Sequence, residues 1–199
     1  MLKRMLTIIA ALTLLAFLAG CSKAPKTEYE SVKESIDKAR ASETAAYAPE
    51  QFKAASDSLN AAMVEMKKQD GKFSLLRKYG KSEKMIASAQ QMVEQANTAA
   101  MTEKERVRVS DSLMIDEINM LITETSTAIA NAPKGKGSRI DLKIMQTDLD
   151  ASKDALALAE SKYKVGSYMI AEEELTAVKS QVLRVKEEID TAIAKLAKK

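Results

Sequence analysis

The sequence predicts an all-α protein made of elongated tandem three-helix bundles, spectrin-like or built from coiled-coil helical hairpins, that share one long central helix. Three observations predict it. Glycine and proline number only six and three in 199 residues and fall mostly in short clusters. Between the clusters, abundant Ala, Lys, Glu and Leu favour helix. Apolar residues recur at alternating steps of three and four, the heptad spacing of helices that pack on other helices.

The first two helices are expected on either side of an Ala-Pro turn. The first begins at Thr27, where Thr27 and Glu30 have the spacing of a capping box, and ends near Tyr47. The second has Pro49 in its first turn and ends near Lys68. A short polar tether precedes them.

The third helix is expected to be the longest, from near Phe73 to about Asn131, with Gly80 inside it. A helix of about 60 residues would be ~90 Å long. Its heptad pattern shifts phase near residue 107, which is typical of a four-residue stutter. The fourth helix is expected from Ser138 to a stop at Gly166, and the fifth from there to the C-terminus.

The chain also contains an internal repeat. Residues 42–49 align with residues 126–133 through a shared Ser and Ala-Pro, and the heptad positions of the second and fourth helices align 90 residues apart. The Gly-x-aromatic turns at 71–73 and 166–168 follow in the same order. We therefore expect the third helix to close one bundle and open the next.

The first residues resemble a targeting signal. Lys3 and Arg4 precede an apolar run over residues 5–17, too short to span a bilayer, and Leu18-Ala19-Gly20-Cys21 resembles the bacterial lipobox at all four positions. The resemblance implies cleavage before Cys21, a thioether-linked lipid on its sulfur and acylation of the new amino terminus. A plain signal peptide and a short membrane anchor are the alternatives.

These features predict four segments: a lipoprotein signal peptide at 1–20, a tether at 21–26, a first helical bundle at 27–100 and a second at 101–199. Ser22 follows the lipobox, where an Asp would resemble a signal for retention in the inner membrane. We therefore expect a lipid-anchored protein on the periplasmic face of the outer membrane.

A second resemblance covers residues 27–100 and, more weakly, 115–197. The stretch Tyr47-Ala48-Pro49-Glu50, Phe52, Ala55, Leu59 and Ala62, followed by Gly71-Lys72-Phe73, resembles an uncharacterised helical domain of bacterial envelope lipoproteins. Some members carry this domain before an OmpA-like peptidoglycan-binding module. The chain differs at Phe52, where the pattern has Leu, and at Lys72, where it has an acidic residue. No OmpA-like module follows the pattern here, so that module's peptidoglycan role does not transfer, and the resemblance implies no catalytic residues.

Composition excludes several functions. With no His and one Cys, one chain cannot build a Cys/His zinc site or a Ser-His or Cys-His catalytic pair. Without Lys3 and Arg4, 29 basic residues face 28 acidic ones, and only 4% of residues are aromatic, so no nucleic-acid partner is expected. Residues 134–138 lack the spacing of a phosphate-binding loop, and Glu172–Glu174 are expected on a solvated helix face. We expect no enzyme, no metal and no cofactor.

The C-terminal Lys199 is a candidate attachment point. A terminal lysine on a helical lipoprotein is similar to Braun's lipoprotein, whose last lysine is joined to peptidoglycan. The alternative is a helix end that favours cations.

The sequence thus predicts a structural or adaptor element of the cell envelope, held by its lipid anchor at Cys21. Its expected partners are the membrane and either other envelope proteins or peptidoglycan, and its apolar seams allow a homo-oligomer. Two alternatives remain: a wall tether through Lys199, and a carrier for an apolar ligand between the helices.

Overall fold

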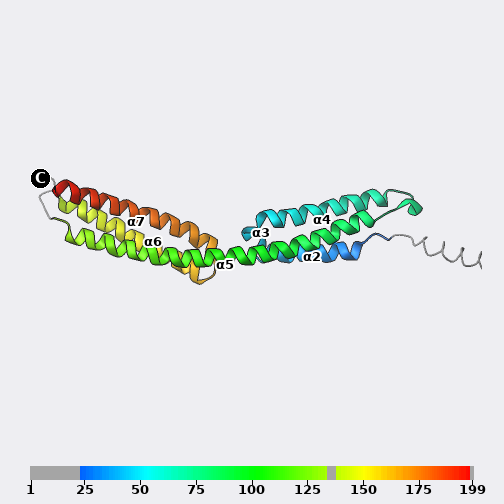
Figure 1. Cartoon of the computed structure of the whole chain (residues 1–199), viewed down its shortest axis with the longest axis horizontal. Coiled ribbons are helices and arrows are strands. Elements are labelled where there is room, and N and C mark those ends of the chain that lie inside the picture. The colour runs from blue at the N-terminus through cyan, green and yellow to red at the C-terminus, as the bar shows by residue number, and fades with distance from the viewer. Residues whose placement is uncertain (1–22, 134–137, 198–199) are drawn as a thin grey trace, which may run out of the picture. The chain divides into compact units, whose positions relative to one another are not determined.

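The computed structural model describes residues 23–133 and 138–197, and every regular element in these ranges is helical, with no strand. The predicted all-α class is therefore confirmed for these ranges. The elements are α2 (Lys26–Ala41), α3 (Thr44–Tyr47), α4 (Pro49–Asp70), the 3₁₀ helix η1 (Ser74–Leu76), α5 (Gly80–Asn131), α6 (Ser138–Lys164) and α7 (Tyr168–Ala197) (Figure 1).

The chain divides into two compact units, Met1–Thr102 and Glu103–Lys199, and α5 contributes residues to both. In unit 1, the α2 and α4 helices pack against the N-terminal part of α5. Their buried side chains follow the predicted heptad steps, and several are as small as alanine. The core of unit 1 contains Tyr29, Val32, Ile36 and Ala39 from α2, Ala55, Leu59, Ala62 and Met66 from α4, and Ile86, Ala89 and Val93 from α5.

Unit 2 has a core of larger aliphatic side chains. The α6 and α7 helices pack against each other and against the C-terminal part of α5. Lys179 donates to Glu117 at 2.7 Å and Lys186 lies 3.9 Å from Glu124, so that α7 and α5 run in the same direction. The core includes Ile118, Ile122 and Ile129 of α5, Leu149 and Leu156 of α6, and Leu175, Val178, Val182, Val185 and Ile189 of α7.

The buried face of α5 changes phase where the sequence predicted it. Near its N-terminus the buried positions alternate steps of three and four. Ser82, Ala89 and Ala96 recur every seven residues, and so do Asp111, Ile118 and Thr125, but Ala96 and Asp111 are 15 residues apart, one more than two heptads. Such an offset between two heptad series is what a stutter produces.

Two predicted boundaries are wrong. The first helix does not run to Tyr47, because α2 ends at Ala41 and Glu43 adopts a left-handed conformation with a φ of 66°. Side-chain hydroxyl groups make additional hydrogen bonds at this break. The Ser42 hydroxyl donates to the Ala39 carbonyl at 3.1 Å, and the buried Thr44 hydroxyl donates to Asn97 of α5 at 2.9 Å.

The third helix begins at Gly80 and not near Phe73. Residues 71–79 form a loop that contains η1, and Phe73 is exposed in it. Tyr168, by contrast, is the first residue of α7 and is half-buried. Residues 71–73 and 166–168 therefore do not occupy matching places, although the sequence pairs them.

The predicted stop at Gly166 is confirmed. Gly166 has a φ of +82°, and the backbone N–H groups of Gly166 and Ser167 donate to the carbonyls of Tyr163 and Lys162, both at 3.0 Å. This pair of hydrogen bonds is a Schellman motif, in which a left-handed residue satisfies the last carbonyls of a helix.

Replacing Gly166 by alanine is expected to destabilise unit 2 by about 1 kcal/mol, because a side chain disfavours positive φ. An added Cβ would meet open space, so that only backbone strain is tested. Gly71 is the control, since its φ of −71° suits any residue and its Cβ would make ordinary contacts. Urea unfolding of G166A and G71A measures the difference, and equal effects would contradict the assignment.

Candidate functional site

The two attachment residues that the sequence singled out, Cys21 and Lys199, lie outside the described residues, as do residues 134–137. The structure describes the chain from Lys23, two residues after Cys21, and α7 ends at Ala197, two residues before Lys199. Cys21 is thus two residues from the described part of unit 1, and Lys199 two residues from that of unit 2.

Over residues 23–133 and 138–197, no group of three or more His, Cys, Asp or Glu side chains is placed to hold a metal ion. None of the helices in those ranges is both long and apolar enough to cross a membrane. Charged side chains largely pair along single helices, for example Lys38 with Glu34 at 2.7 Å and Arg106 with Glu103 at 2.8 Å. Exposed pairs of this kind stabilise a helix only slightly.

A buried carboxyl group in unit 2 departs from this pattern. Asp111 of α5 is fully buried, with a relative exposure of 0%, and neither of its carboxyl oxygens has a hydrogen-bond partner among the described residues. Its heptad position points it into unit 2. A buried carboxylate without partners is costly, because it loses its hydration and gains nothing in return.

The surroundings of Asp111 favour its neutral form. Burial is the main cause that raises the pKa of Asp111 to about 6, from an ordinary value of 3.8; the negative charge of Glu172 raises it further and the positive charge of Arg106 opposes the shift. Glu172 lies in the first turns of α7 and is itself half-buried. Of Glu172–Glu174, which were predicted on a solvated helix face, only Glu173 is exposed. Glu172 is half-buried, and one carboxyl oxygen of Glu174 is buried without a hydrogen-bond partner among the described residues.

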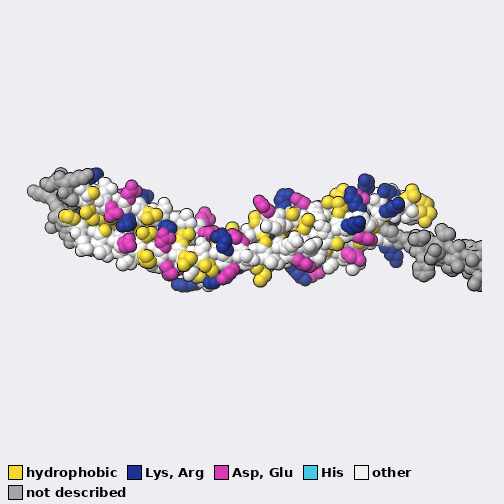
Figure 2. Space-filling model, in the orientation of Figure 1, with side chains coloured by type: hydrophobic (Ala, Val, Ile, Leu, Met, Phe, Trp, Pro, Cys, Tyr) yellow, Lys and Arg dark blue, Asp and Glu magenta, His cyan; other side chains and the backbone are white. Residues whose placement is uncertain are grey.

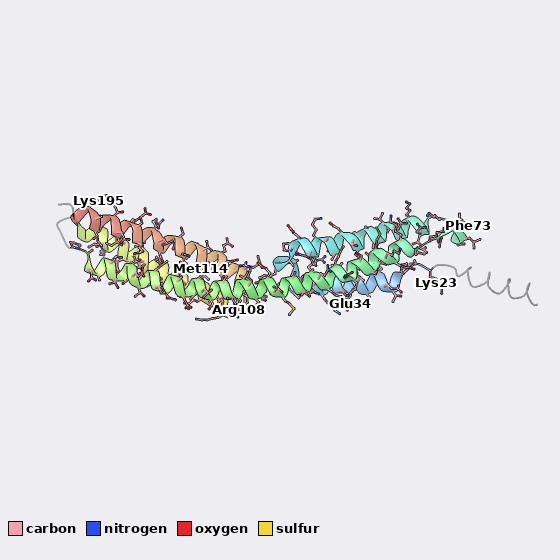
Figure 3. All side chains as sticks on the ribbon, viewed as in Figure 1. Lys23, Glu34, Phe73, Arg108, Met114 and Lys195 are labelled. Carbon is pink, nitrogen blue, oxygen red and sulfur yellow. The ribbon has the colours of Figure 1, made fainter. Side chains whose placement is uncertain are left out.

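Aromatic and basic side chains surround the α6–α7 turn of the same unit. The rings of Tyr163 and Tyr168 lie 5.3 Å apart at 54°, and the Lys104 ammonium of α5 is 5.8 Å from the centre of the Tyr168 ring. Hydrogen bonds, chiefly to Glu105 and then to Tyr163, raise the pKa of Arg108 (labelled in Figure 3). Together these side chains connect the α6–α7 turn to α5.

Asp111 is suited to pH-dependent packing and not to catalysis. An acid–base catalyst must reach its substrate, and a fully buried side chain does not. The sequence reasoning missed this residue because it treated the phase shift of α5 only as a change in helix winding. The signal was present, since an Asp stands four residues after the heptad position Val107.

The second feature that the sequence reasoning missed lies in unit 1. The α4–α5 loop, residues 71–79, exposes large apolar side chains between basic ones, in the order Lys72-Phe73-Ser74-Leu75-Leu76-Arg77-Lys78. Treating these residues as the start of a helix concealed the pattern. The alternation of an apolar tip and basic flanks was readable in the sequence.

Comparisons with protein-family models, with curated proteins and with solved structures find no match to this chain. The inferences below therefore depend on its own residues.

Replacing Asp111 by asparagine tests the buried carboxyl. In the unfolded chain Asp111 has its ordinary pKa, so the folded chain binds the Asp111 proton more tightly. The stability that this proton confers on the fold is complete below pH 4 and is lost as the pH rises through about 6. D111N is expected to raise the free energy of unfolding at pH 7 by about 1–3 kcal/mol and to have little effect at pH 4. The exposed Asp116, as D116N, is the control. Urea unfolding across this pH range measures it, and a pH-independent effect of D111N would refute the assignment.

Proposed function

We propose that this chain is a lipid-anchored, non-enzymatic helical lipoprotein of the periplasmic face of the outer membrane, and that it acts as a structural or adaptor element of the cell envelope. The observation that carries the proposal is the direct succession of the lipobox Leu18-Ala19-Gly20-Cys21 and a folded helical unit. The α2 helix begins at Lys26, five residues after Cys21. An acyl anchor at Cys21 would thus hold unit 1 close to the bilayer.

We infer further that the two units are tandem three-helix bundles that arose by duplication and share α5, a spectrin-like arrangement. Core positions of α4 and α6 correspond 90 residues apart. Those of α5 and α7 correspond 89 residues apart, beginning with the buried Tyr79, just before α5, and the half-buried Tyr168. The pairs are Ala55 with Met145, Leu59 with Leu149, Ala62 with Ser152 and Met66 with Leu156, and then Tyr79 with Tyr168, Ser82 with Ala171, Ile86 with Leu175, Ala89 with Val178, Val93 with Val182 and Ala96 with Val185.

The same comparison supplies a reason for the break after α2. Val32 and Ile36 correspond to Ile118 and Ile122 of α5, 86 residues apart, whereas Ala48 corresponds to Ala132 at a separation of 84. Unit 1 therefore has two extra residues between these points. Two residues turn a helix by about 200°, which would move the following residues off the core. The left-handed Glu43 between α2 and α3 absorbs the insertion.

An adaptor role draws on surfaces that the cores leave free. In unit 2 the exposed side chains of Val109, Leu113 and Met120 lie along α5 at helical spacing. Such a stripe suits another helix, from an envelope protein or from a second copy.

The wall-tether and ligand-carrier alternatives make different demands. A tether needs the ε-amine of Lys199 to be bonded to a muropeptide, and a carrier needs an apolar ligand between the helices. Mass spectrometry of the C-terminal peptide after lysozyme digestion, and native mass spectrometry of the purified chain, test them. An unmodified C-terminus and a ligand-free mass would leave the structural role.

Replacing Cys21 by serine is expected to abolish acylation, because serine has no thiol to form the thioether. The mature N-terminal peptide should carry the mass of the lipid in the original chain and not in C21S, and C21S should leave the membrane fraction. S22A is the control, since it keeps the sulfur. An original chain without lipid would end the proposal.

Replacing Ser22 by aspartate is expected to shift the acylated protein from the outer to the inner membrane in a Gram-negative host. The S22D side chain resembles the retention signal, whereas S22T should stay with the outer membrane. Density-gradient separation of the two membranes measures the distribution. Identical distributions for S22D and S22T would contradict outer-membrane sorting.

A further inference from the structure

The α4–α5 loop presents three large apolar side chains to solvent. Phe73, Leu75 and Leu76 are 70%, 77% and 65% exposed, and they lie within four consecutive residues. Figure 2 shows hydrophobic side chains beside a group of Lys and Arg side chains at this end of unit 1. Water-facing apolar side chains in such a short segment cost free energy unless a partner covers them.

Hydrogen bonds at its base hold the loop in shape. The Arg77 guanidinium donates to the carbonyls of Asp70 and Lys72, both at 3.0 Å. The Gln69 side chain, which is buried, accepts from the Lys72 ammonium at 2.9 Å and from the Lys78 backbone N–H at 3.2 Å. The apolar side chains therefore project from a closed loop.

Tyr79 fixes the other end of the loop. Its ring is 1% exposed in the unit 1 core, and its hydroxyl donates to the Asp70 carboxylate. With Tyr79 in the core and Asp70 at the end of α4, the loop is bound to both helices. The exposure of the tip is thus a property of the folded unit.

Charge around the loop is one-sided. Residues 67–84 contain seven Lys and Arg but two Asp and Glu, and Lys23 and Lys26 add two more cations. The mature chain as a whole is close to neutral. Basic residues around an apolar tip are typical of segments that bind an anionic lipid surface, where each cation near the surface adds attraction.

The loop lies beside the start of the described chain. Lys23, Ala24 and Lys26 line one hollow together with Ser74 and Arg77, and Lys23 and Phe73 are at the same end of unit 1 (Figure 3). Cys21 is only two residues before Lys23. A lipid attached at Cys21 would therefore be next to the loop.

We propose that the α4–α5 loop is a second membrane contact: Phe73, Leu75 and Leu76 enter the interface of a bilayer that contains anionic lipid, and the surrounding Lys and Arg side chains bind its headgroups. The role of this contact beside a lipid anchor rests on the proposed function. Binding of the loop to an anionic bilayer does not itself require the acyl chains. The anchor supplies affinity, and the loop sets which end of unit 1 faces the bilayer.

A second copy of the chain fits this loop less well. Two such loops would bring like charges together, and the apolar tip is three side chains on a turn, not a helix face that could form a seam. An anionic surface, by contrast, complements the flanking cations and offers an apolar interior at the depth that the tip reaches.

The chain has no tryptophan, so a single Trp reports on one position. F73W in the full acylated protein, reconstituted in vesicles of phosphatidylethanolamine and phosphatidylglycerol, is expected to be quenched about twofold or more by brominated lipid. The control V64W places Trp at an exposed position within α4 and is expected to remain unquenched. Circular dichroism confirms that both variants keep their helices.

Unacylated C21S/F73W distinguishes the two proposals. It is expected to bind the anionic vesicles weakly, to lose that binding in high salt, and to bind severalfold less when Leu75 and Leu76 are also changed to serine. Quenching of F73W without acylation of the original chain supports the loop contact and overturns the anchor. Unquenched F73W in an acylated, vesicle-bound chain overturns the loop contact alone, and so does an emission shift that depends on protein concentration without vesicles.

Discussion

One helix has to serve two hydrophobic cores. The α5 helix packs on α2 and α4 through its N-terminal residues and on α6 and α7 through its C-terminal residues, so its buried stripe must stay in register with both sets. The heptad series of the two parts are offset by one residue between Ala96 and Asp111. Each inserted residue turns the following part of a helix by about 100°, so an insertion within either core would move the later buried side chains of that core toward solvent.

Several polar side chains within the cores have hydrogen-bond partners. The buried hydroxyls of Ser82, Thr125 and Ser152 donate to backbone carbonyls three or four residues earlier, at 2.7, 2.7 and 2.9 Å, so their burial costs little. Asp111 has no such partner. We therefore expect the packing of unit 2 to depend on whether the Asp111 carboxyl is protonated.

Periodicity predicted the helices and most of the core, because heptad spacing places the apolar side chains on one face of each helix. It failed where chain geometry depends on local bonds. Nothing in the composition of residues 42–43 marks a left-handed residue. The start of α5 at Gly80 depends on Gln69, before the loop, and on Tyr79, its last residue, which fix the loop at its two ends. The resemblance of residues 18–21 to a lipobox is visible in the sequence alone, whereas the exposure of the loop required knowing that Phe73 is not helical.

The two cores differ in the size of the side chains that fill them. Unit 1 relies on Ala39, Ala55, Ala62 and Ala89, while unit 2 is filled mainly by leucine, isoleucine and valine. Smaller side chains remove less apolar area from water, so unit 1 is held by the weaker hydrophobic drive. Under tension applied between the two ends of the chain, the N-terminal half would therefore unfold at the lower force, while the C-terminal half stayed helical.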